Sequence, residues 1–97
     1  MKRSDAIFRL QSHADQLRSA GVAGLYLFGS TARDEAEAGS DVDLFFDTIQ
    51  PGYSLFDVMA LRDMLVDLLR SRVDVMTRGS LHPYLRPRIE AEAVKVF

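Results

Sequence analysis

The stretch LYLFGSTARDEAEAGSDVDLFFD, residues 25–47, decides the fold, because two apolar runs enclose a polar segment with a Gly-Ser pair and an Asp-Val-Asp triplet. The apolar runs predict two buried strands, over residues 23–28 and 41–47. Glycine allows the backbone to turn sharply, so Gly29 and Ser30 predict a turn that leads into a short helix. A strand, a tight turn, a short helix and a second strand are therefore expected within this stretch.

Two aspartates, Asp41 and Asp43, lie two positions apart in the second predicted strand. Side chains alternate along a strand, so both carboxylates are expected on one face, about 7 Å apart. If unpaired, they repel each other, and one of them tends to take up a proton. Two interpretations follow: Asp41 caps the strand while Asp43 is solvated, or the pair binds a divalent cation such as Mg²⁺.

A third acid, Asp74, lies between Val73 and Val75 in a predicted strand over residues 72–76. If the two valines face the core, Asp74 projects from the opposite face. Pairing of this strand with the one over residues 41–47 would bring three carboxylates together at a site for one or two metal ions. The alternative is a surface carboxylate on a half-exposed strand.

The Gly-Ser pair also has two interpretations. The first backbone amides of a helix have no partner within the helix and lie at the positive end of its dipole, so they favour a bound phosphate. Gly29 allows a ligand to approach closely, and the Ser30 hydroxyl supplies a further donor. Gly-Ser alone is also a common turn. With three acids nearby, phosphate binding is the interpretation that we favour.

The rest of the chain predicts helices between the strands. Residues 4–20 have an amphipathic pattern, and residues 55–71, preceded by Ser54 as N-cap, repeat apolar side chains at helical spacing. Ser80 opens a short helical tail, and residues 93–97 fit either a helix end or an edge strand. Helices that alternate with strands predict an α/β fold, with a small mixed β-sheet and flanking helices.

The chain length fits a single domain over residues 1–97. The net charge is −2, whereas a general nucleic-acid binder is basic, so no direct nucleic-acid binding is expected. The absence of cysteine excludes disulfides and thiol chemistry. No apolar stretch approaches the roughly 20 residues of a membrane span, and the first residues are too charged for a signal peptide. We therefore expect a cytoplasmic protein without membrane contact.

The motifs and their spacing resemble a known signature. FGSTAR at 28–33, a ten-residue spacer between its serine and the first aspartate, SDVDLFF at 40–46, and Asp74 in a later strand resemble the DNA polymerase beta-like nucleotidyltransferase superfamily. Within it, the chain is similar to the minimal nucleotidyltransferases. The resemblance implies the polymerase beta-like nucleotidyltransferase fold. One departure is Asp34, where many relatives carry glycine, and it puts the local loop shape in question.

The resemblance also implies roles for individual residues. Three acids would bind two Mg²⁺ ions and carry the catalysis: Asp41, Asp43 and Asp74. Three residues would hold the triphosphate of ATP: Gly29, Ser30 and Arg33. Asp74 would also help to deprotonate the attacking hydroxyl. For Arg33, an ion pair with Glu37 four residues later is an equally good interpretation.

In function, the resemblance implies a metal-dependent nucleotidyltransferase that moves NMP, with AMP from ATP as first choice, to a hydroxyl acceptor. Many minimal nucleotidyltransferases resemble antitoxins, which implies a HEPN ribonuclease toxin as partner in a hetero-oligomer and one of its tyrosines as acceptor. Two alternatives stay open: an antitoxin that blocks its toxin by binding alone, and an enzyme with a small-molecule acceptor. A polymerase or tRNA-terminal transferase is disfavoured, because those need further domains and a basic surface.

Overall fold

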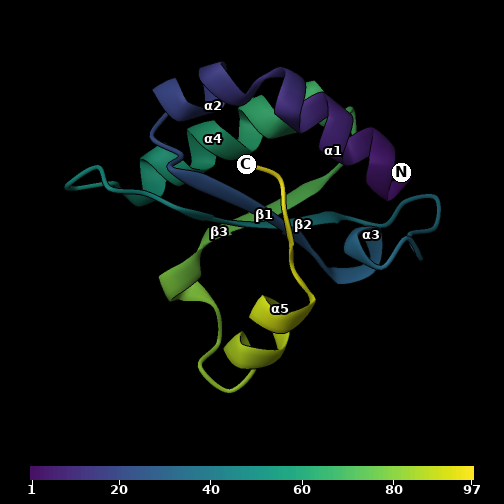
Figure 1. Ribbon diagram of the computed structural model, residues 1–97. Coiled ribbons are helices and arrows are strands. Elements are labelled where there is room, and N and C mark those ends of the chain that lie inside the picture. The colour runs from purple at the N-terminus through teal and green to yellow at the C-terminus, as the bar shows by residue number, and fades with distance from the viewer.

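The computed structural model describes residues 1–97 and contains a four-stranded sheet with helices on both faces (Figure 1). The elements in chain order are α1 (Arg3–Ser12), α2 (Ala14–Ser19), β1 (Gly24–Phe28), α3 (Gly29–Ala32), β2 (Val42–Asp47), α4 (Leu55–Leu69), β3 (Val73–Thr77), η1 (Arg78–Ser80), α5 (Arg86–Glu92) and β4 (Val94–Lys95). This arrangement confirms the predicted mixed sheet with flanking helices. None of the helices is both long and apolar enough to cross a lipid bilayer.

The strands are ordered β3-β2-β1-β4 across the sheet. β1 runs antiparallel to β2 and to β4, whereas β2 and β3 run parallel. A parallel pair needs a crossover connection, and α4 supplies it between β2 and β3. At the opposite edge, β4 pairs with β1, so the segment 93–97 contains a short edge strand and is not a helix end.

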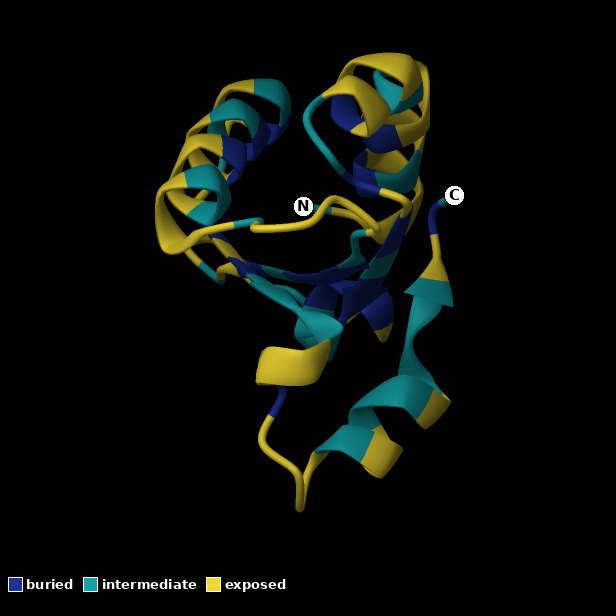
Figure 2. Cartoon of the chain, turned by 90° about the vertical axis from the view of Figure 1, so that its left-hand side faces the viewer, coloured by how far each residue is buried: buried dark blue, intermediate teal, exposed yellow.

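The helices form two layers of unequal size. α1, α2 and α4 cover one face of the sheet, and α5 lies on the other (Figures 1 and 2). Consecutive residues of β2 serve both layers: Phe46 belongs to the main core, whereas Phe45 packs with Phe28 and Leu81 on the α5 face. In Figure 2 the buried residues gather along the sheet and on the helix sides that face it. The alternation of a strand therefore places Asp43, like Phe45, on the α5 face.

The N-terminal helical region is divided, whereas one helix over residues 4–20 was expected. The break lies at His13, whose backbone leaves the helical region with φ −116° and ψ 21°. There the Ser12 hydroxyl donates to the Phe8 carbonyl at 2.7 Å, and Nδ1 of His13 bonds to the Arg9 carbonyl at 2.8 Å. Side chains that bond to helix carbonyls compete with the backbone amides, which explains the break.

Ser54 begins α4 as the sequence predicts. The Asp57 backbone N–H donates to the Ser54 hydroxyl at 3.3 Å, and the Ser54 backbone N–H donates to the Asp57 carboxylate at 2.8 Å. This reciprocal cap satisfies amides of the first turn that have no partner within the helix. The cap thus fixes the start of α4, the crossover helix after which β3 pairs with β2.

Candidate active site

Two acids from neighbouring strands lie opposite each other on the α5 face. Asp43 of β2 is in register with Asp74 of β3 in the parallel ladder. Val73 and Val75, on either side of Asp74, are buried in the main core, so the Asp74 side chain points to the opposite face. The structure thus confirms that the predicted third strand lies beside the second one and that Asp74 meets Asp43.

The charge of Asp43 is costly in this position. Burial raises the pKa of Asp43 to about 6, and the nearby carboxylates of Asp74 and Asp41 add to the rise, while Arg33 opposes it. Both causes disfavour an anion, the first by desolvation and the second by repulsion. The site therefore favours whatever brings positive charge to Asp43, such as a proton or a cation.

Asp41 lies just before β2 and has a cationic partner of its own. Its carboxylate pairs with Nε of Arg72 at 3.0 Å, and the same guanidinium donates to the Gly39 carbonyl. The expected cluster of three carboxylates does not form: no three Asp, Glu, His or Cys side chains are arranged to hold a metal ion, and Asp41 is paired with Arg72 instead. The donor set nevertheless fits Mg²⁺, because this ion binds to one or two protein carboxylates and takes its other oxygens from water and phosphates.

Gly29 joins the Gly-Ser pair to the acids. Its backbone has φ +72°, a conformation that side chains other than glycine rarely adopt, and a Cβ at this position would overlap the Asp43 carboxylate. Position 29 therefore requires glycine for two reasons. The structure brings together two motifs whose proximity the sequence only implied through the resemblance.

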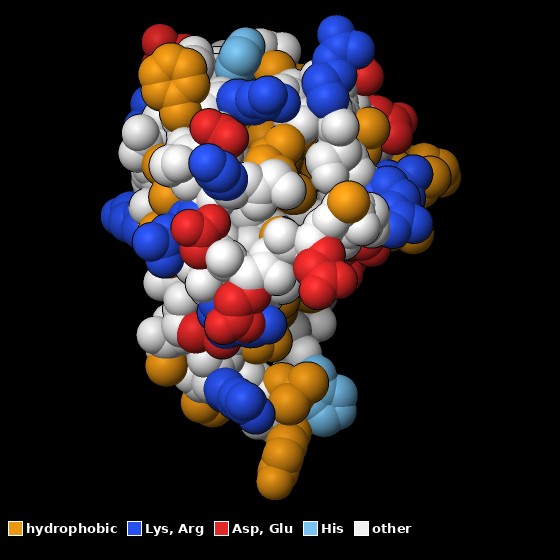
Figure 3. All heavy atoms as spheres, turned by 90° about the vertical axis from the view of Figure 1, so that its right-hand side faces the viewer, with side chains coloured by type: hydrophobic (Ala, Val, Ile, Leu, Met, Phe, Trp, Pro, Cys, Tyr) orange, Lys and Arg blue, Asp and Glu red, His pale blue; other side chains and the backbone are white.

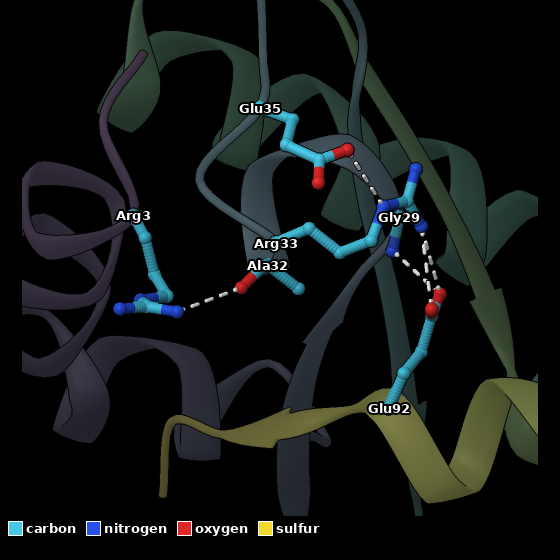
Figure 4. Close-up of polar contacts among 6 residues, drawn as sticks. All are labelled: Arg3, Gly29, Ala32, Arg33, Glu35 and Glu92. Atoms are coloured by element: carbon cyan, nitrogen blue, oxygen red, sulfur yellow. Dashed lines mark hydrogen bonds and ion pairs between the residues drawn. The ribbon is translucent and has the colours of Figure 1, made fainter.

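Arg33 does not form the ion pair with Glu37 that was one of its two interpretations. It contacts Glu35, with Nε to carboxylate at 3.3 Å, and Glu92, with 3.3 Å from its terminal nitrogen to each carboxylate oxygen (Figure 4). The turn after α3 ends the helix at Ala32, so the i+4 spacing does not apply. Glu92 also accepts from the Gly29 backbone N–H at 3.3 Å.

Glu92 is the site residue that sequence reasoning missed. It belongs to α5, far from the motifs in sequence, and only the return of the C-terminal segment over the sheet brings it to Gly29. No local pattern marks it among the acids of the tail. Figure 3 shows acidic and basic side chains side by side on the side of the molecule where α1 and α3 lie.

Asp34, the departure from the family pattern, keeps the loop shape that glycine would allow. Its φ is +59°, in the left-handed region, which aspartate tolerates better than most residues. Its carboxylate accepts from the Arg3 backbone N–H at 3.0 Å, and the Arg3 side chain donates to the Ala32 carbonyl at 3.1 Å (Figure 4). These bonds hold the turn after α3 against α1.

Asp47, the last residue of β2, anchors the end of the α5 face that lies away from Asp43. Arg78 donates to both Asp47 carboxylate oxygens, at 2.8 and 2.9 Å, and to Glu90 of α5 at 2.6 Å. Its guanidinium lies over the rings of Tyr26 and Phe45. The hydrogen bonds from Arg78 hold the pKa of Asp47 below its usual value. Glu90 and Glu92, both in the last turn of α5, thus tie this helix to Arg78 of η1 and to the α3 segment.

The fold and the paired acids agree with the family that a comparison of the whole chain identifies. The family model described as "Nucleotidyltransferase domain" matches residues 10–96. The chain belongs to this family, and it is an enzyme of the minimal nucleotidyltransferase type.

Three known proteins show how near the likeness is. A Methanocaldococcus jannaschii protein named "Putative protein adenylyltransferase MJ0435" is 42% identical over 76 residues, 78% of this chain and 81% of the relative. The solved "Structure of putative minimal nucleotidyltransferase" has a TM-score of 0.83 at 32% identity and covers 97% of this chain and 95% of that chain. A chain in the complex of tri-AMPylated Shewanella oneidensis HEPN toxin with MNT antitoxin has a TM-score of 0.70 at 18% identity, over 95% of this chain and 71% of that chain. The last likeness shows the fold alone.

Proposed function

We propose that residues 1–97 form one catalytic domain that transfers AMP from ATP to a tyrosine of a HEPN toxin and thereby acts as an antitoxin. The observation that carries this proposal is the placement of Asp43 beside Asp74 and directly against Gly29. Support comes from the name of the M. jannaschii relative, a protein adenylyltransferase, and from the AMPylated toxin in the complex that shares the fold.

Asp43 and Asp74, with Asp41, would hold Mg²⁺. These carboxylates lie where an added cation relieves their mutual repulsion, as the raised pKa of Asp43 indicates. Bound Mg²⁺ supplies charge neutralisation for the phosphates during transfer. For Asp41 to contribute, its carboxylate has to leave Arg72, with which it pairs in this structure.

The chain's own residues would position the reactants. Gly29, Ser30 and Arg33 hold the triphosphate, with Arg33 and the backbone N–H groups as donors. Asp74, exposed on the edge strand β3, accepts the proton of the attacking tyrosine hydroxyl. The hydroxyl oxygen bonds to the α-phosphorus, the bond from the α-phosphorus to the oxygen bridging to the β-phosphate breaks, and pyrophosphate leaves.

An antitoxin that acts by binding alone is the second candidate. It is favoured by the large apolar side chains that α4 exposes at Leu55, Phe56 and Met59, the kind of surface that packs against a partner protein. Catalysis and binding can contribute together, and a variant without catalysis separates them.

A growth assay in which the product of the neighbouring gene serves as the candidate toxin tests the proposal. Asp43→Asn keeps the shape of the side chain, removes its charge and is expected to bind the toxin as the wild type does. If catalysis silences the toxin, wild type restores growth and Asp43→Asn does not, although both co-purify with the toxin. Full rescue by Asp43→Asn would instead support neutralisation by binding alone.

A further inference from the structure

The Glu92 carboxylate occupies the donors that the proposed function assigns to phosphate. It accepts from the Gly29 backbone N–H at 3.3 Å and pairs through both oxygens with the Arg33 guanidinium at 3.3 Å. Figure 4 shows Gly29 and Arg33 converging on this carboxylate. A carboxylate and a phosphate group are both anions with acceptor oxygens, and both suit a guanidinium and a backbone N–H.

The remainder of α5 does not depend on this contact. Glu90 is bonded to Arg78 at 2.6 Å and to Arg86 at 3.2 Å. Ile89 and Ala93 pack against the cluster of Phe28, Phe45 and Leu81. The helix thus has polar and apolar anchors besides Glu92, so the Glu92 side chain can swing away while the helix stays in place.

The Glu92 side chain has room for that movement. It is 30% exposed, and the Arg33 side chain is 46% exposed, so the ion pair lies at the surface. Exposed ion pairs of this kind are weak, because water competes for both partners. A polyanion with several phosphate groups is a stronger competitor for the same donors than a single carboxylate.

We infer that Glu92 stands in for a phosphate group in the nucleotide-free protein and has to leave Gly29 and Arg33 when the triphosphate binds. Glu92 thereby sets the affinity for nucleotide: it holds the donors in position and opposes the incoming anion. This inference rests on the proposed function, because it takes ATP as the ligand of Gly29 and Arg33.

Nucleotide affinity of Glu92 variants tests the inference. The probe is α,β-methylene-ATP with excess Mg²⁺, titrated calorimetrically into the full chain, since its methylene bridge prevents transfer. Glu92→Gln removes the charge that competes, and its affinity is expected to rise about five- to tenfold. Glu92→Asp keeps the charge but shortens the side chain, and it is also expected to bind more tightly than wild type, because it withdraws the carboxylate from Gly29.

Glu35→Gln is the matched control. Glu35 also pairs with Arg33 at 3.3 Å but makes no contact with Gly29. Its loss is expected to change the affinity less than about twofold, since an exposed ion pair is worth little. Equal gains for Glu35→Gln and Glu92→Gln would overturn the inference, because the effect would then be one of general charge.

The remaining outcomes distinguish a failure of the role inferred for Glu92 from a failure of the proposed function. If wild type binds the analogue and the affinities of Glu92→Gln and Glu92→Asp are equal to or lower than that of wild type, the role of Glu92 is overturned. The proposed function is then unaffected. If no version of the chain binds the analogue, the proposed function and the inference both fail. Circular dichroism of each variant confirms that α5 and the sheet remain folded.

Discussion

Gly29 lies against the carboxylate of Asp43 so closely that a β-carbon at position 29 would overlap it. The positive φ of Gly29 adds a backbone reason for the same residue. The Gly-Ser turn and the Asp-Val-Asp strand are therefore one unit: β2 begins beside a turn that has no side chain at position 29, and the Asp43 carboxylate fills that space.

Gly29→Ala is expected to displace Asp43 and to lower transfer activity by about 100-fold, because a shift of roughly 1 Å at a reacting group has that effect. The strained φ and the overlap should also lower the free energy of unfolding by about 1–3 kcal/mol. Steady-state transfer rates and urea unfolding measure the two effects.

Gly52→Ala provides the matched control. Gly52 has nearly the same φ, +71°, but no atom lies within 4 Å of a Cβ built there. Gly52→Ala should lower the free energy of unfolding only by the cost of the positive φ, about 1 kcal/mol, and should keep the transfer activity of wild type. If Gly29→Ala behaved like Gly52→Ala in both assays, the close approach of Gly29 to Asp43 would have no functional weight.

The raised pKa of Asp43 predicts that the contribution of this group to the stability of the metal-free protein falls as the pH rises. The folded state holds the proton of Asp43 up to about pH 6, whereas an ordinary aspartate releases it near 3.8. The neutral form therefore favours folding at low pH, and that contribution is lost as the pH rises from about 4 through 6. Since Asp43 is partly exposed, the loss is discounted to about 1–2 kcal/mol.

Urea unfolding in EDTA at pH 4.5 and pH 8 checks this expectation against Asp43→Asn. The variant carries no charge at this position, so it should be more stable than wild type at pH 8 and close to it at low pH. If wild type has a higher free energy of unfolding than Asp43→Asn at pH 8 without metal, the Asp43 charge does not destabilise the fold.

Asp74→Asn is expected to abolish transfer without loss of stability. Its side chain lies on the exposed face of the edge strand, and its charge repels Asp43, so the neutral variant should unfold at an equal or higher urea concentration. Asp63→Asn removes an exposed carboxylate of α4 and should keep the activity of wild type. Retained transfer by Asp74→Asn would remove Asp74 from the catalytic set.

Arg78→Lys tests the anchor of α5. Lysine keeps the charge but cannot donate to both Asp47 oxygens and Glu90 in the same planar geometry. The expected loss in the free energy of unfolding is about 1–2 kcal/mol, measured by urea titration. Arg88→Lys, on the exposed side of α5, is the control and should change stability little. Equal stability of the two variants would show that the Arg78 contacts are dispensable.

The parts of this fold that follow from local patterns were predictable from sequence. Alternation within β2 places Asp43 opposite the core, and the valines that flank Asp74 orient it in the same way. Ser54 identified the start of α4 because a cap acts within one turn. For Asp43 and Asp74 to meet, β2 and β3 also have to be neighbours in the sheet. The residue pattern alone did not decide this, whereas the family resemblance implied it.

The contacts that sequence reasoning missed join residues far apart in the chain. Glu92 and Arg33 meet because α5 folds back over the sheet, whereas Arg78 meets Asp47 because each directly follows the last pair in the parallel register of β2 and β3. The pairing of Asp41 with Arg72 depends on the register of β2 and β3. Side-chain chemistry alone does not select such partners, since each charged residue has many possible counterions.

The most direct test follows the α-phosphate of ATP. The chain is incubated with Mg²⁺, ATP radiolabelled at the α-phosphate, and the product of the neighbouring gene as the candidate HEPN protein. Asp43→Asn is run in parallel. Adenylyl transfer predicts label on a tyrosine of the HEPN protein with wild type and none with Asp43→Asn. An unlabelled HEPN protein in the presence of folded wild type, or equal labelling by the variant, would contradict the assignment of Asp43 to protein adenylylation.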